Sequence, residues 1–518
     1  MIALYKSGDI YAQRNSSEGA VIGTPFRVND DAASSDQNNP CLSTDNNGNF
    51  IVTWIDQRNG NFDLYAQRYS RDGTTRGTNF QVNEVMGSIG VFWSPIGVVG
   101  PCTPSMCTDD NSNFVMAWVD RRNGSSSGDF DIYAQRYSSD GTAMGANFKV
   151  NDDKAGAGQW APAISSDSDG NFVIAWQNSP SGHVWDIWDD SDIYAQRYSN
   201  DGTALGDNFK VSDDQGDESK WRPAISMNDS GNFVIAWEGD NIYAQRYSRD
   251  GTALGANFKV NDDNSGGRSP SLSMDISMDN NGNFVITWEG DGIYAQRYSD
   301  GGVALGANFK VNSSGRYFLG HPSISKDGSG NFVIAWGDER NGGWDNRDIY
   351  AQRYLSDGTT LGENFRVTDT GDKNQSSPDV KLWNGLIYTT WVDNRAGGTG
   401  YDIWANVLDG EFPATRISDQ EIPRAPSAFM LKQNYPNPFN PTTVIQYQLS
   451  KNSMVTLEVF NFIGQRIKTL VQQNQPSGIH MQIWDGTNDY GEIVPTGVYF
   501  YQLHSGTFSE TKKMLLMH

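Results

Sequence analysis

The chain has 518 residues and a formal net charge of −23, with 39 Lys and Arg against 62 Asp and Glu. This length exceeds one ordinary hydrophobic core and predicts several domains or a repeat architecture, and the acidic charge excludes nucleic acid as a favoured partner. Aromatic residues make up 12% and glycines number 55, which is typical of a β-rich, turn-rich globular protein. No stretch approaches the ~20 apolar residues of a membrane helix, so no transmembrane segment is expected.

The first residues, MIALYKSGDIYAQR, match the middle of a motif that recurs along the chain. They contain neither a basic start nor the apolar run of a signal peptide. Residues 2–4 fall where residues 235–237 stand in VIAWEGDNIYAQR. We therefore expect this sequence to begin inside a repeat, with its true beginning upstream.

A repeat of four short words fills residues 1 to about 420. The tyrosine of the word YAQR recurs at Tyr11, Tyr65, Tyr133, Tyr194, Tyr243, Tyr294 and Tyr350, and a degenerate eighth copy has Trp404. GNFVIAW or a variant precedes most copies, NFKVND or a relative follows, and PAIS or PSIS opens the next unit. Each word is rich in β-branched and aromatic residues, with turn-forming Gly, Asn, Asp and Ser between the words. The pattern predicts four strands per unit.

Both faces of these predicted strands are apolar. In NFVIAW, Phe, Ile and Trp alternate with Val and Ala, and a sheet apolar on both faces needs cover on both sides, as in a propeller blade. Seven complete units and a partial unit at residues 1–30 predict an all-β fold: a β-propeller with seven complete blades and an N-terminal partial blade, in an eight-bladed ring. A seven-bladed ring with a stray N-terminal hairpin is the alternative.

The connections between strands fall into two sets on opposite faces of a propeller. Turns between strands one and two, and between three and four, are nearly constant here, as in DSDGN and SNDGTALGDN. The remaining connections vary widely in length. Because function is usually carried by variable loops on a constant scaffold, we place any binding on the second face, called the variable face below; the first is the constant face.

Residues that the repeat does not demand are the candidates for ligand binding on the variable face. Aromatic side chains beside charged ones suit sugar rings, whose C–H faces stack on an indole while their hydroxyls need hydrogen-bond partners. The candidates are Trp93, Trp160, Trp185, Trp188, Trp221, Arg222, Tyr317, His321, Arg340 and Trp344. The alternative is that the aromatic side chains plug loop bases and the channel mouth.

The repeated arginine of YAQR and the tryptophan that ends the second word are interpreted as parts of the blade. A catalytic group is needed once, whereas every blade needs a residue that covers its neighbour or pairs with a hairpin aspartate. The arginines are Arg14, Arg68, Arg136, Arg197, Arg246, Arg297 and Arg353.

No catalytic or zinc-binding motif is present: there is no nucleophile elbow, HExxH motif, Walker loop or zinc spacing. Asp338, Glu339 or the Asp-rich stretch 186–192 could supply the two carboxylates of a glycosidase, but acids are abundant in the loops of so acidic a chain. We predict no catalytic site, no metal site and no cofactor. Calcium at turns such as DSDGN, with Asp167 and Asp169, is the alternative to simple Asx-turn hydrogen bonding.

After a linker at residues 421–430 the repeat stops, and residues 431–518 form a second predicted domain. Strands are expected in VIQYQL, MVTLEVFN, QRIKTLV, HMQIWDG and GVYFYQL, separated by turns that contain Gly or Pro. About 90 residues of this pattern suit a small Ig-like β-sandwich.

This second segment resembles, over its whole length, the C-terminal sorting domain of type IX secretion substrates in Bacteroidetes, which is related to the FlgD Ig-like fold. The motifs YPNPFNPTT, VFNFIGQRIKTL and WDGTNDYGEIVPTGVYFYQL and the basic ending carry the resemblance. It implies a sorting signal that includes Tyr435, Pro436, Asn437, Pro438, Phe439, Asn440, Pro441, Gly464, Gly497, Tyr499, Lys512 and Lys513. It also implies export after a signal peptide, through the type IX machinery. The repeats are similar to those of exported bacterial proteins whose functions are mostly unassigned.

The sequence therefore predicts an exported, monomeric propeller, secreted or held at the outer cell surface. It is expected to act as a binding or adhesion module, without enzymatic activity, for a polysaccharide or glycoprotein. The alternatives are a carbohydrate-active hydrolase or lyase and a structural surface component. An enzyme should bring carboxylates together at the channel mouth, whereas a binder should present a shallow strip of aromatic side chains.

Overall fold

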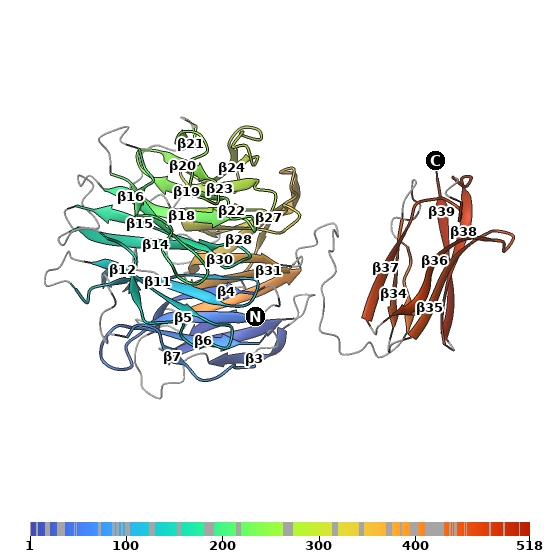
Figure 1. The fold of residues 1–518 in the computed structure, drawn as a ribbon, viewed down its shortest axis with the longest axis horizontal. Coiled ribbons are helices and arrows are strands. Elements are labelled where there is room, and N and C mark those ends of the chain that lie inside the picture. Colours follow the sequence, from blue (N-terminus) through green and yellow to red (C-terminus); the bar gives the residue numbers. More distant parts are fainter. Residues whose placement is uncertain are drawn as a thin grey trace. The chain divides into compact units, whose positions relative to one another are not determined.

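The computed structural model divides the chain into two compact units, Met1–Arg416 and Ile417–His518, and shows strands but no helix in the parts that it describes (Figure 1). Each unit is described by itself. The described residues are 2–6, 9–15, 21–27, 37–45, 47, 49–70, 74–84, 89, 93–94, 97–98, 104–123, 130–152, 157–180, 191–213, 219–262, 273–312, 320–340, 347–368, 375–383, 386–393, 402–409, 429–434, 437, 439, 443–449, 451, 453–475, 478–490, 493–506 and 508–517.

In these ranges the first unit has eight blade sheets, in which each strand pairs antiparallel with the next along the chain. Blade 1 contains β1 (Ile2–Lys6), β2 (Asp9–Asn15) and β3 (Val21–Arg27), and blade 2 contains β4 (Gln37–Thr44), β5 (Phe50–Asp56), β6 (Asp63–Tyr69) and β7 (Phe80–Gln81). Blade 3 contains β10 (Ser105–Thr108), β11 (Phe114–Asp120), β12 (Asp131–Tyr137) and β13 (Phe148–Lys149), and blade 4 contains β14 (Gly158–Ser166), β15 (Phe172–Ser179), β16 (Asp192–Tyr198) and β17 (Phe209–Lys210). A small hairpin, β8 (Trp93–Ser94) and β9 (Gly97–Val98), precedes blade 3.

Blades 5 to 8 follow the same order. Blade 5 contains β18 (Trp221–Met227), β19 (Phe233–Glu238), β20 (Ile242–Tyr247) and β21 (Phe258–Lys259), and blade 6 contains β22 (Met274–Met278), β23 (Phe284–Glu289), β24 (Ile293–Tyr298) and β25 (Phe309–Lys310). Blade 7 contains β26 (Gly320–Lys326), β27 (Phe332–Asp338), β28 (Asp348–Tyr354) and β29 (Thr360–Arg366), and blade 8 contains β30 (Gln375–Trp383), β31 (Leu386–Asp393) and β32 (Asp402–Asp409).

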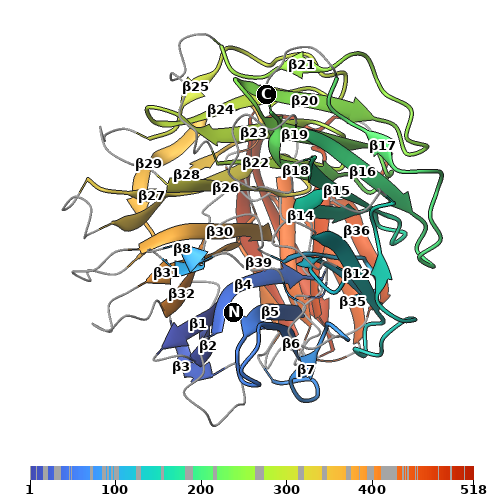
Figure 2. The same cartoon turned by 90° about the vertical axis from the view of Figure 1, so that its left-hand side faces the viewer.

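The blades follow one another around a ring. First strands of neighbouring blades contact each other, as β14 does with β18 and β26 with β30, and β1 contacts both β32 and β4. Blade 1 therefore lies between blades 8 and 2 (Figure 2). The predicted fold class, an all-β propeller with a partial first blade, is confirmed. Blade 8 has three strands in the described ranges, and residues 410–419, which follow β32, lie outside them.

The hydrophobic core consists of the seams between blades. In blade 5, Trp237 packs against Val173 and Ala175 of blade 4, while Val234 and Ala236 pack with blade 6. The second-strand tryptophans are at most 2% exposed, which confirms them as core residues: Trp54, Trp118, Trp176, Trp237, Trp288 and Trp336. Burying each large apolar side chain contributes roughly 1.5–3 kcal/mol.

On the constant face, the repeated arginines of blades 2, 3, 5 and 6 bond to the following blade. Arg136 Nη2 donates to the carbonyl oxygen of Asn200 at 2.6 Å, and Arg246 donates to those of Asp300 and Gly301 at 2.8 and 2.7 Å. The acceptors belong to the turn between strands three and four of the following blade. Arg68 and Arg297 make equivalent bonds, to Ser139 and Ser356. For these arginines, the interpretation as blade parts is confirmed.

The glycine of this turn leaves room for the arginine. A Cβ on Gly202, at φ +85°, would lie 2.6 Å from Arg136 Nη1, whereas on Gly206, at φ +82°, it would meet nothing within 4 Å. Both Gly→Ala substitutions carry the cost of a left-handed non-glycine residue, about 1 kcal/mol, but only G202A also displaces the guanidinium from its acceptors.

We expect G202A to lower the free energy of unfolding by about 2 kcal/mol more than G206A. Denaturant titration of the two variants measures the difference. Equal losses would show that the arginine does not stabilise the seam.

The constant turns between strands one and two are held by their own aspartates. Asp167 accepts hydrogen bonds from the Asn171 backbone N–H and side-chain amide, both at 2.8 Å. Asp45, Asp109, Asp279 and Asp327 hold their turns in the same way. Within the described ranges no group of three or more His, Cys, Asp or Glu could hold a metal ion. Asx-turn bonding thus accounts for these aspartates, and the calcium alternative gains no support.

The second unit is a β-sandwich. One sheet contains β33 (Met430–Leu431), β34 (Thr443–Leu449) and β37 (Gly478–Trp484), and the other runs in the order β36 (Arg466–Gln475), β35 (Ser453–Asn461), β38 (Gly497–Ser505) and β39 (Phe508–Leu516). Tyr447, Trp484 and Tyr501 fill the core between them. The five expected strands are present, and β39 is a further strand that includes Lys512 and Lys513 of the basic ending.

The end of β39 bonds to Asn437 and Phe439. The Phe439 backbone N–H donates to Leu515 O at 3.0 Å, and Met517 N–H donates to Phe439 O at 2.9 Å. Asn437 Oδ1 accepts from Leu515 N–H at 2.8 Å. The buried Phe439 ring packs on Trp484, with 5.6 Å between ring centroids. These two residues of the predicted sorting signal therefore have a structural role.

Other residues of that predicted signal also lie in structural positions. Gly464, at φ 81°, closes the turn between β35 and β36, Gly497 begins β38, and the Tyr499 hydroxyl donates to Pro495 O at 2.7 Å. Tyr435, Pro436, Pro438, Asn440 and Pro441 lie outside the described residues.

Candidate functional site

One position near the end of the second strand changes character between blades. It is Ile55 in blade 2 and Val119 in blade 3, both fully buried, but Gln177, Glu238 and Glu289 in blades 4, 5 and 6. In all five, this residue pairs with the one just before the third-strand tyrosine. An apolar side chain packs between neighbouring blades without a desolvation cost, whereas burying a carboxyl group there costs free energy. The fold does not require these acids, which marks the position as a functional candidate.

Glu238 is a buried acid with an unsatisfied oxygen. It is 4% exposed, and its Oε1 has no hydrogen-bond partner. Its place in β19 puts it on the face of Val234 and Ala236, toward blade 6. Burial raises the pKa of Glu238 to about 8; the nearby Arg222 opposes the shift and Glu289 adds to it. At neutral pH Glu238 is therefore mainly a neutral acid that can donate a proton.

Glu289 is the second acid and belongs to the next blade. Its side chain is half-buried, and burial raises its pKa to about 7. The backbone N–H of His321 hydrogen bonds to its carboxylate, and with Arg347 and Arg222 this opposes the rise. Glu289 thus loses its proton more readily than Glu238, so the two acids can take opposite protonation states near neutral pH.

Arg222 and His321 reach the acids from bulges in first strands. β18 and β26 shift register between Trp221 and Ala224 and between Gly320 and Ser323. Within the bulges Arg222 has φ 45° and His321 φ 48°, and each precedes a proline. Ala161 has φ 50° in the equivalent bulge of blade 4. The bulge thus recurs in blades 4, 5 and 7, and it changes the direction of a side chain whose identity differs from blade to blade.

His321 is an exposed imidazole surrounded by cationic groups. Atoms of the packed blades desolvate the ring although it keeps solvent access, and together with the charges of Arg222 and Arg347 they lower the pKa of His321 to about 4. Arg347, just before β28, pairs with Glu339, with 2.8 Å between Nε and Oε1. His321 is therefore neutral at neutral pH, and the site combines two weak acids, an imidazole and two guanidinium groups.

Of the ligand-binding residues predicted from the sequence, the structure brings Arg222 and His321 together. Trp221, half-buried, is the register partner of Glu238. Trp160 was placed wrongly, because its indole is 0% exposed and packs on Phe130, with 4.2 Å between ring centroids. The side chains of Trp93, Trp185, Trp188, Tyr317 and Trp344 lie outside the described residues.

Arg340 has a structural role. Its guanidinium lies 3.9 Å from the centre of the Tyr350 ring and bonds to Asp338, which also accepts from the Trp336 indole N–H at 2.9 Å. Blades 2 and 3 repeat this arrangement around Arg58 and Arg122. Asp338, one of the carboxylates considered from the sequence, is thus already engaged in hydrogen bonds within blade 7. Residues 186–190 of the Asp-rich stretch lie outside the described ranges.

Sequence reasoning missed Glu238, Glu289 and Arg347. A signal for the two acids was present, because glutamate directly follows the second-strand tryptophan only in blades 5 and 6, in the words WEGDN and WEGDG. No comparable signal marks Arg347, whose position depends on how blade 7 packs.

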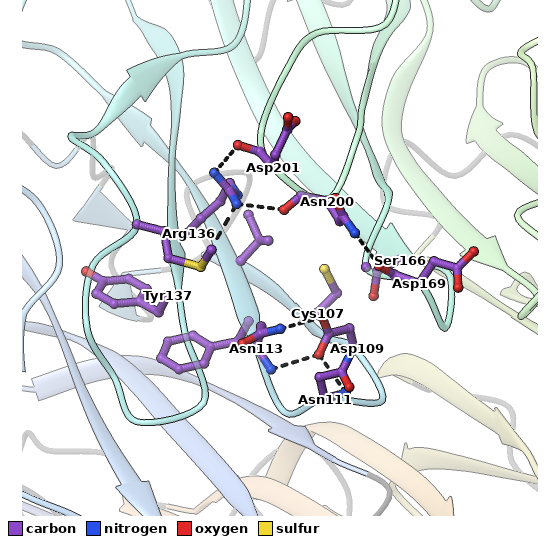
Figure 3. Close-up of a pocket in the computed structure, with 14 residues that line it drawn as sticks. Cys107, Asp109, Asn111, Asn113, Arg136, Tyr137, Ser166, Asp169, Asn200 and Asp201 are labelled. Atoms are coloured by element: carbon purple, nitrogen blue, oxygen red, sulfur yellow. Dashed lines mark hydrogen bonds between the residues drawn. The ribbon is translucent and has the colours of Figure 1, made fainter.

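A cavity of about 430 Å³ lies on the constant face between blades 3 and 4 (Figure 3). Its polar groups are already engaged, since Asp109 holds its own turn and Arg136 bonds to Asn200 and Asp201. Cys107 is a free thiol whose pKa burial raises to about 12, which makes it unreactive. The cavity therefore offers less chemistry than the acid pair.

Comparison with known proteins adds a family to the second unit. Residues 439–507 match the FlgD Ig-like domain family. No curated protein sequence is significantly similar to the chain. Among the residues described, no helix is long and apolar enough to cross a membrane.

Several solved structures are similar to the chain at low identity. Polysaccharide lyase Uly1 has 9% identity and a TM-score of 0.45, covering 79% of this chain and 99% of its own. An α-L-arabinanase of Penicillium chrysogenum complexed with arabinobiose has 10% identity and a TM-score of 0.40, covering 72% and 93%. A Dyadobacter fermentans protein of unknown function has 12% identity and a TM-score of 0.40, covering 60% and 94%.

The fold and the site together define a class: a β-propeller with an acid pair at the variable face of adjacent blades. The propeller is followed in the chain by a FlgD Ig-like domain.

Proposed function

We propose that this protein is a carbohydrate-active enzyme that cleaves glycosidic bonds at the variable face of its propeller. The observation that carries the proposal is the presence of the buried Glu238 and the half-buried Glu289 in two consecutive blades, at a position that is apolar in blades 2 and 3. Both pKa values lie near neutrality, where acid–base catalysis is most efficient. Oε1 of Glu238 is buried without a hydrogen-bond partner, which costs free energy that the fold alone does not explain.

The two acids take different roles because their surroundings differ. Glu238, which keeps its proton to higher pH, protonates the glycosidic oxygen as the leaving group departs. Glu289, whose carboxylate accepts the His321 backbone N–H, acts in its ionised form as the base that takes one proton from the attacking water. The hydroxyl that remains bonds to the anomeric carbon as the bond from that carbon to the leaving oxygen breaks. Glu289 then releases its proton to solvent and Glu238 takes one from solvent, so both groups return to their starting states. Two carboxyl groups with separated pKa values are the usual equipment for this reaction.

A binding or adhesion module without catalysis is less well supported. Such a module is expected to present an exposed strip of aromatic side chains. Among the predicted aromatic residues whose side chains the structure describes, Trp160 is buried and Trp221 half-buried. A pure binder also gains nothing from buried neutral acids, which cost free energy. Glu289 is close enough to Glu238 for its charge to raise the pKa of Glu238, and we take this proximity as support for the enzyme alternative.

Incubation of the purified chain with a panel of polysaccharides, followed by measurement of new reducing ends, tests the proposal. Hydrolysis of at least one polymer is expected. Formation of unsaturated sugars, seen as ultraviolet absorbance, would replace hydrolysis with elimination. Failure to cleave any polymer in a panel that includes neutral, uronate-containing and sulfated chains would overturn the proposal.

We also propose that the second unit directs export through the type IX machinery and leaves the propeller secreted or on the cell surface. Support comes from the resemblance of residues 431–518 to sorting domains. It also comes from the bonds between Phe439 and the end of β39, which tie this residue of the predicted sorting signal to the last strand. A fluorescent reporter carrying a signal peptide and residues 429–518 should leave cells that possess this machinery. Retention inside such cells would contradict the proposal.

A further inference from the structure

A small residue at one position of the repeat lines the cavity between blades 3 and 4. This position pairs with the phenylalanine that begins the second strand of its blade. Blade 4 has Ser166 there, whereas blades 5, 6 and 7 have the longer Met227, Met278 and Lys326. The cavity beside Ser166 measures about 430 Å³, which lies within the roughly 300–1,000 Å³ of small-molecule sites.

In blade 7 the long side chain at this position is a cation. Lys326 Nζ lies 3.1 Å from Asp279 Oδ2 of blade 6, and it donates to Asn283 O of the same turn at 3.2 Å. The side chains of Lys326 and Asp279 are 4% and 3% exposed. In the seam between blades 6 and 7, an ammonium group thus neutralises a buried carboxylate of the preceding blade.

Blade 3 presents the same two acceptors to the cavity. Asp109 and Asn113 are the equivalents of Asp279 and Asn283, and both line it. Asp109 Oδ1 accepts from the Asn113 backbone N–H at 2.8 Å, and Oδ2 accepts from its side-chain amide at 2.9 Å. The same turn bonding coexists with the ion pair in blade 6, because a carboxylate has about four acceptor positions. A Cβ on Gly170 would lie 2.7 Å from Asp109 Oδ2, so this oxygen faces blade 4.

Two neighbouring seams balance the charge at this position in other ways. In blade 4, Asp167 Oδ2 is 3.6 Å from Arg249 Nη2 of the next blade, and in blade 5 the neutral Asn228 replaces the aspartate. Asp109 is 8% exposed, and its hydrogen bonds within the described part of the chain come from its own turn, with no Lys, Arg or His donor. A buried carboxylate without a countercharge costs free energy, which a bound cation would offset.

The rest of the lining suits an aliphatic stem. Phe114, Val115 and Tyr137 line the cavity and are buried. Arg136 also lines it, but its guanidinium donates to two backbone carbonyl oxygens of the following turn (Figure 3). The cavity therefore combines an apolar wall with a carboxylate.

Acidic groups surround this part of the constant face. Burial raises the pKa of Asp110, and the charges of Asp229, Asp109 and Asp169 add to the rise. Asp169 also lines the cavity. Such a concentration of negative charge attracts cations and repels anions.

We infer that the cavity binds a primary alkyl ammonium group, in the place that Lys326 Nζ takes in the seam between blades 6 and 7. Its nitrogen donates to Asp109 Oδ2 and Asn113 O, and its stem lies against Phe114 and Val115. An alkyl amine of this kind has a pKa of about 10.4 and is charged at neutral pH. The site lies on the constant face and is distinct from the acid pair. A free alkyl amine and the lysine side chain of a peptide both carry this group.

Calorimetric titration of the full chain with cadaverine, a linear diamine, at about pH 7 and low salt tests the inference. The corresponding diol is the neutral control of the same shape. We expect the diamine to bind with a Kd of about 1 mM or tighter and the diol not to bind. D109N should weaken diamine binding about 10- to 100-fold, the range of one charge-assisted hydrogen bond. D140N removes an exposed carboxylate from the same blade and face, and it should bind as wild type does.

S166K supplies the ammonium group from the chain itself, as Lys326 does in blade 7. It should abolish diamine binding and raise the midpoint of urea unfolding, and the gain in midpoint should be lost in the D109N/S166K double variant. The loss of binding in S166K also decides the outcome if D109N does not fold.

A blocked lysine, Nα-acetyl-lysine methylamide, distinguishes the two sources of the group. Binding of this compound that depends on Asp109 would assign the site to a lysine side chain, and binding of the diamine alone would assign it to a free amine. Diamine binding that survives D109N or S166K, equal binding of the diol, or no binding of either amine would overturn the inference.

Discussion

Glu238→Gln is expected to lower kcat/KM on the cleaved polysaccharide by about 10²- to 10⁴-fold, the usual contribution of a positioned general acid. The amide keeps the shape of the side chain but has no proton to transfer to the leaving oxygen. Glu289→Gln should give a loss of similar size. Glu363→Gln, an exposed acid on the outer strand β29, is the control and should retain full activity.

The pH profile gives a second readout of the same pair. Activity should rise as Glu289 ionises, with its pKa near 7, and fall as Glu238 loses its proton, with its pKa near 8. The profile is thus a narrow bell with its maximum between these values. In E238Q the residual activity should lack the falling limb. A falling limb that persists in E238Q would assign the acid to another residue.

Glu238→Ile is expected to stabilise the protein above neutral pH while abolishing its activity. The pKa of Glu238 is raised from 4.5 to about 8, so the folded state binds this proton more tightly than the unfolded state does. Its contribution to stability therefore falls as pH rises from about 4.5 to about 8, and the full cost is present above that window. This cost is at most about 5 kcal/mol. Isoleucine removes it because it has no carboxyl group, and it fits the position because Ile55 occupies the equivalent position in blade 2.

Urea titration of wild type and E238I at about pH 5 and about pH 9 measures this difference, which should be largest at the higher pH. Gln177→Ile is the matched control, because Gln177 occupies the equivalent position in blade 4 and does not titrate. Its effect on stability should be the same at both pH values. A gain for E238I that does not depend on pH would show that the carboxyl group is not desolvated in the folded state.

Much of the propeller was predictable because its signals are local. Alternation within words such as NFVIAW and the Gly-Asn-Asp turns between them predicted the strands and the ring of blades. The repetition of the YAQR arginine predicted its structural role, which the bond from Arg136 to Asn200 bears out. In the second unit the same reasoning missed β39, since its sequence, FSETKKMLL, places two lysines where a strand pattern is hard to recognise.

The predicted ligand-binding residues remain a prediction. Arg222 and His321 were singled out because both break the repeat, although nothing in the sequence says that they lie near each other. Trp160 was expected at the surface because loop aromatic residues often lie there, but Phe130 covers it. Arg340 and Asp338 looked like candidates until their repetition in blades 2 and 3 showed a structural arrangement.

The sequence by itself determined most strands and turns, because side-chain alternation and backbone preferences act over a few residues. It left open whether the ring has seven or eight blades, which the contacts of β1 with β32 and β4 decided. Only the tertiary structure decided which side chains meet. Glu238 and Glu289 belong to different repeats, and their raised pKa values arise from desolvation by the blades packed against them. Burial is a property of the assembled ring. In the sequence Glu238 is one of many acids, and it holds its proton near neutral pH only because the neighbouring blades pack against it.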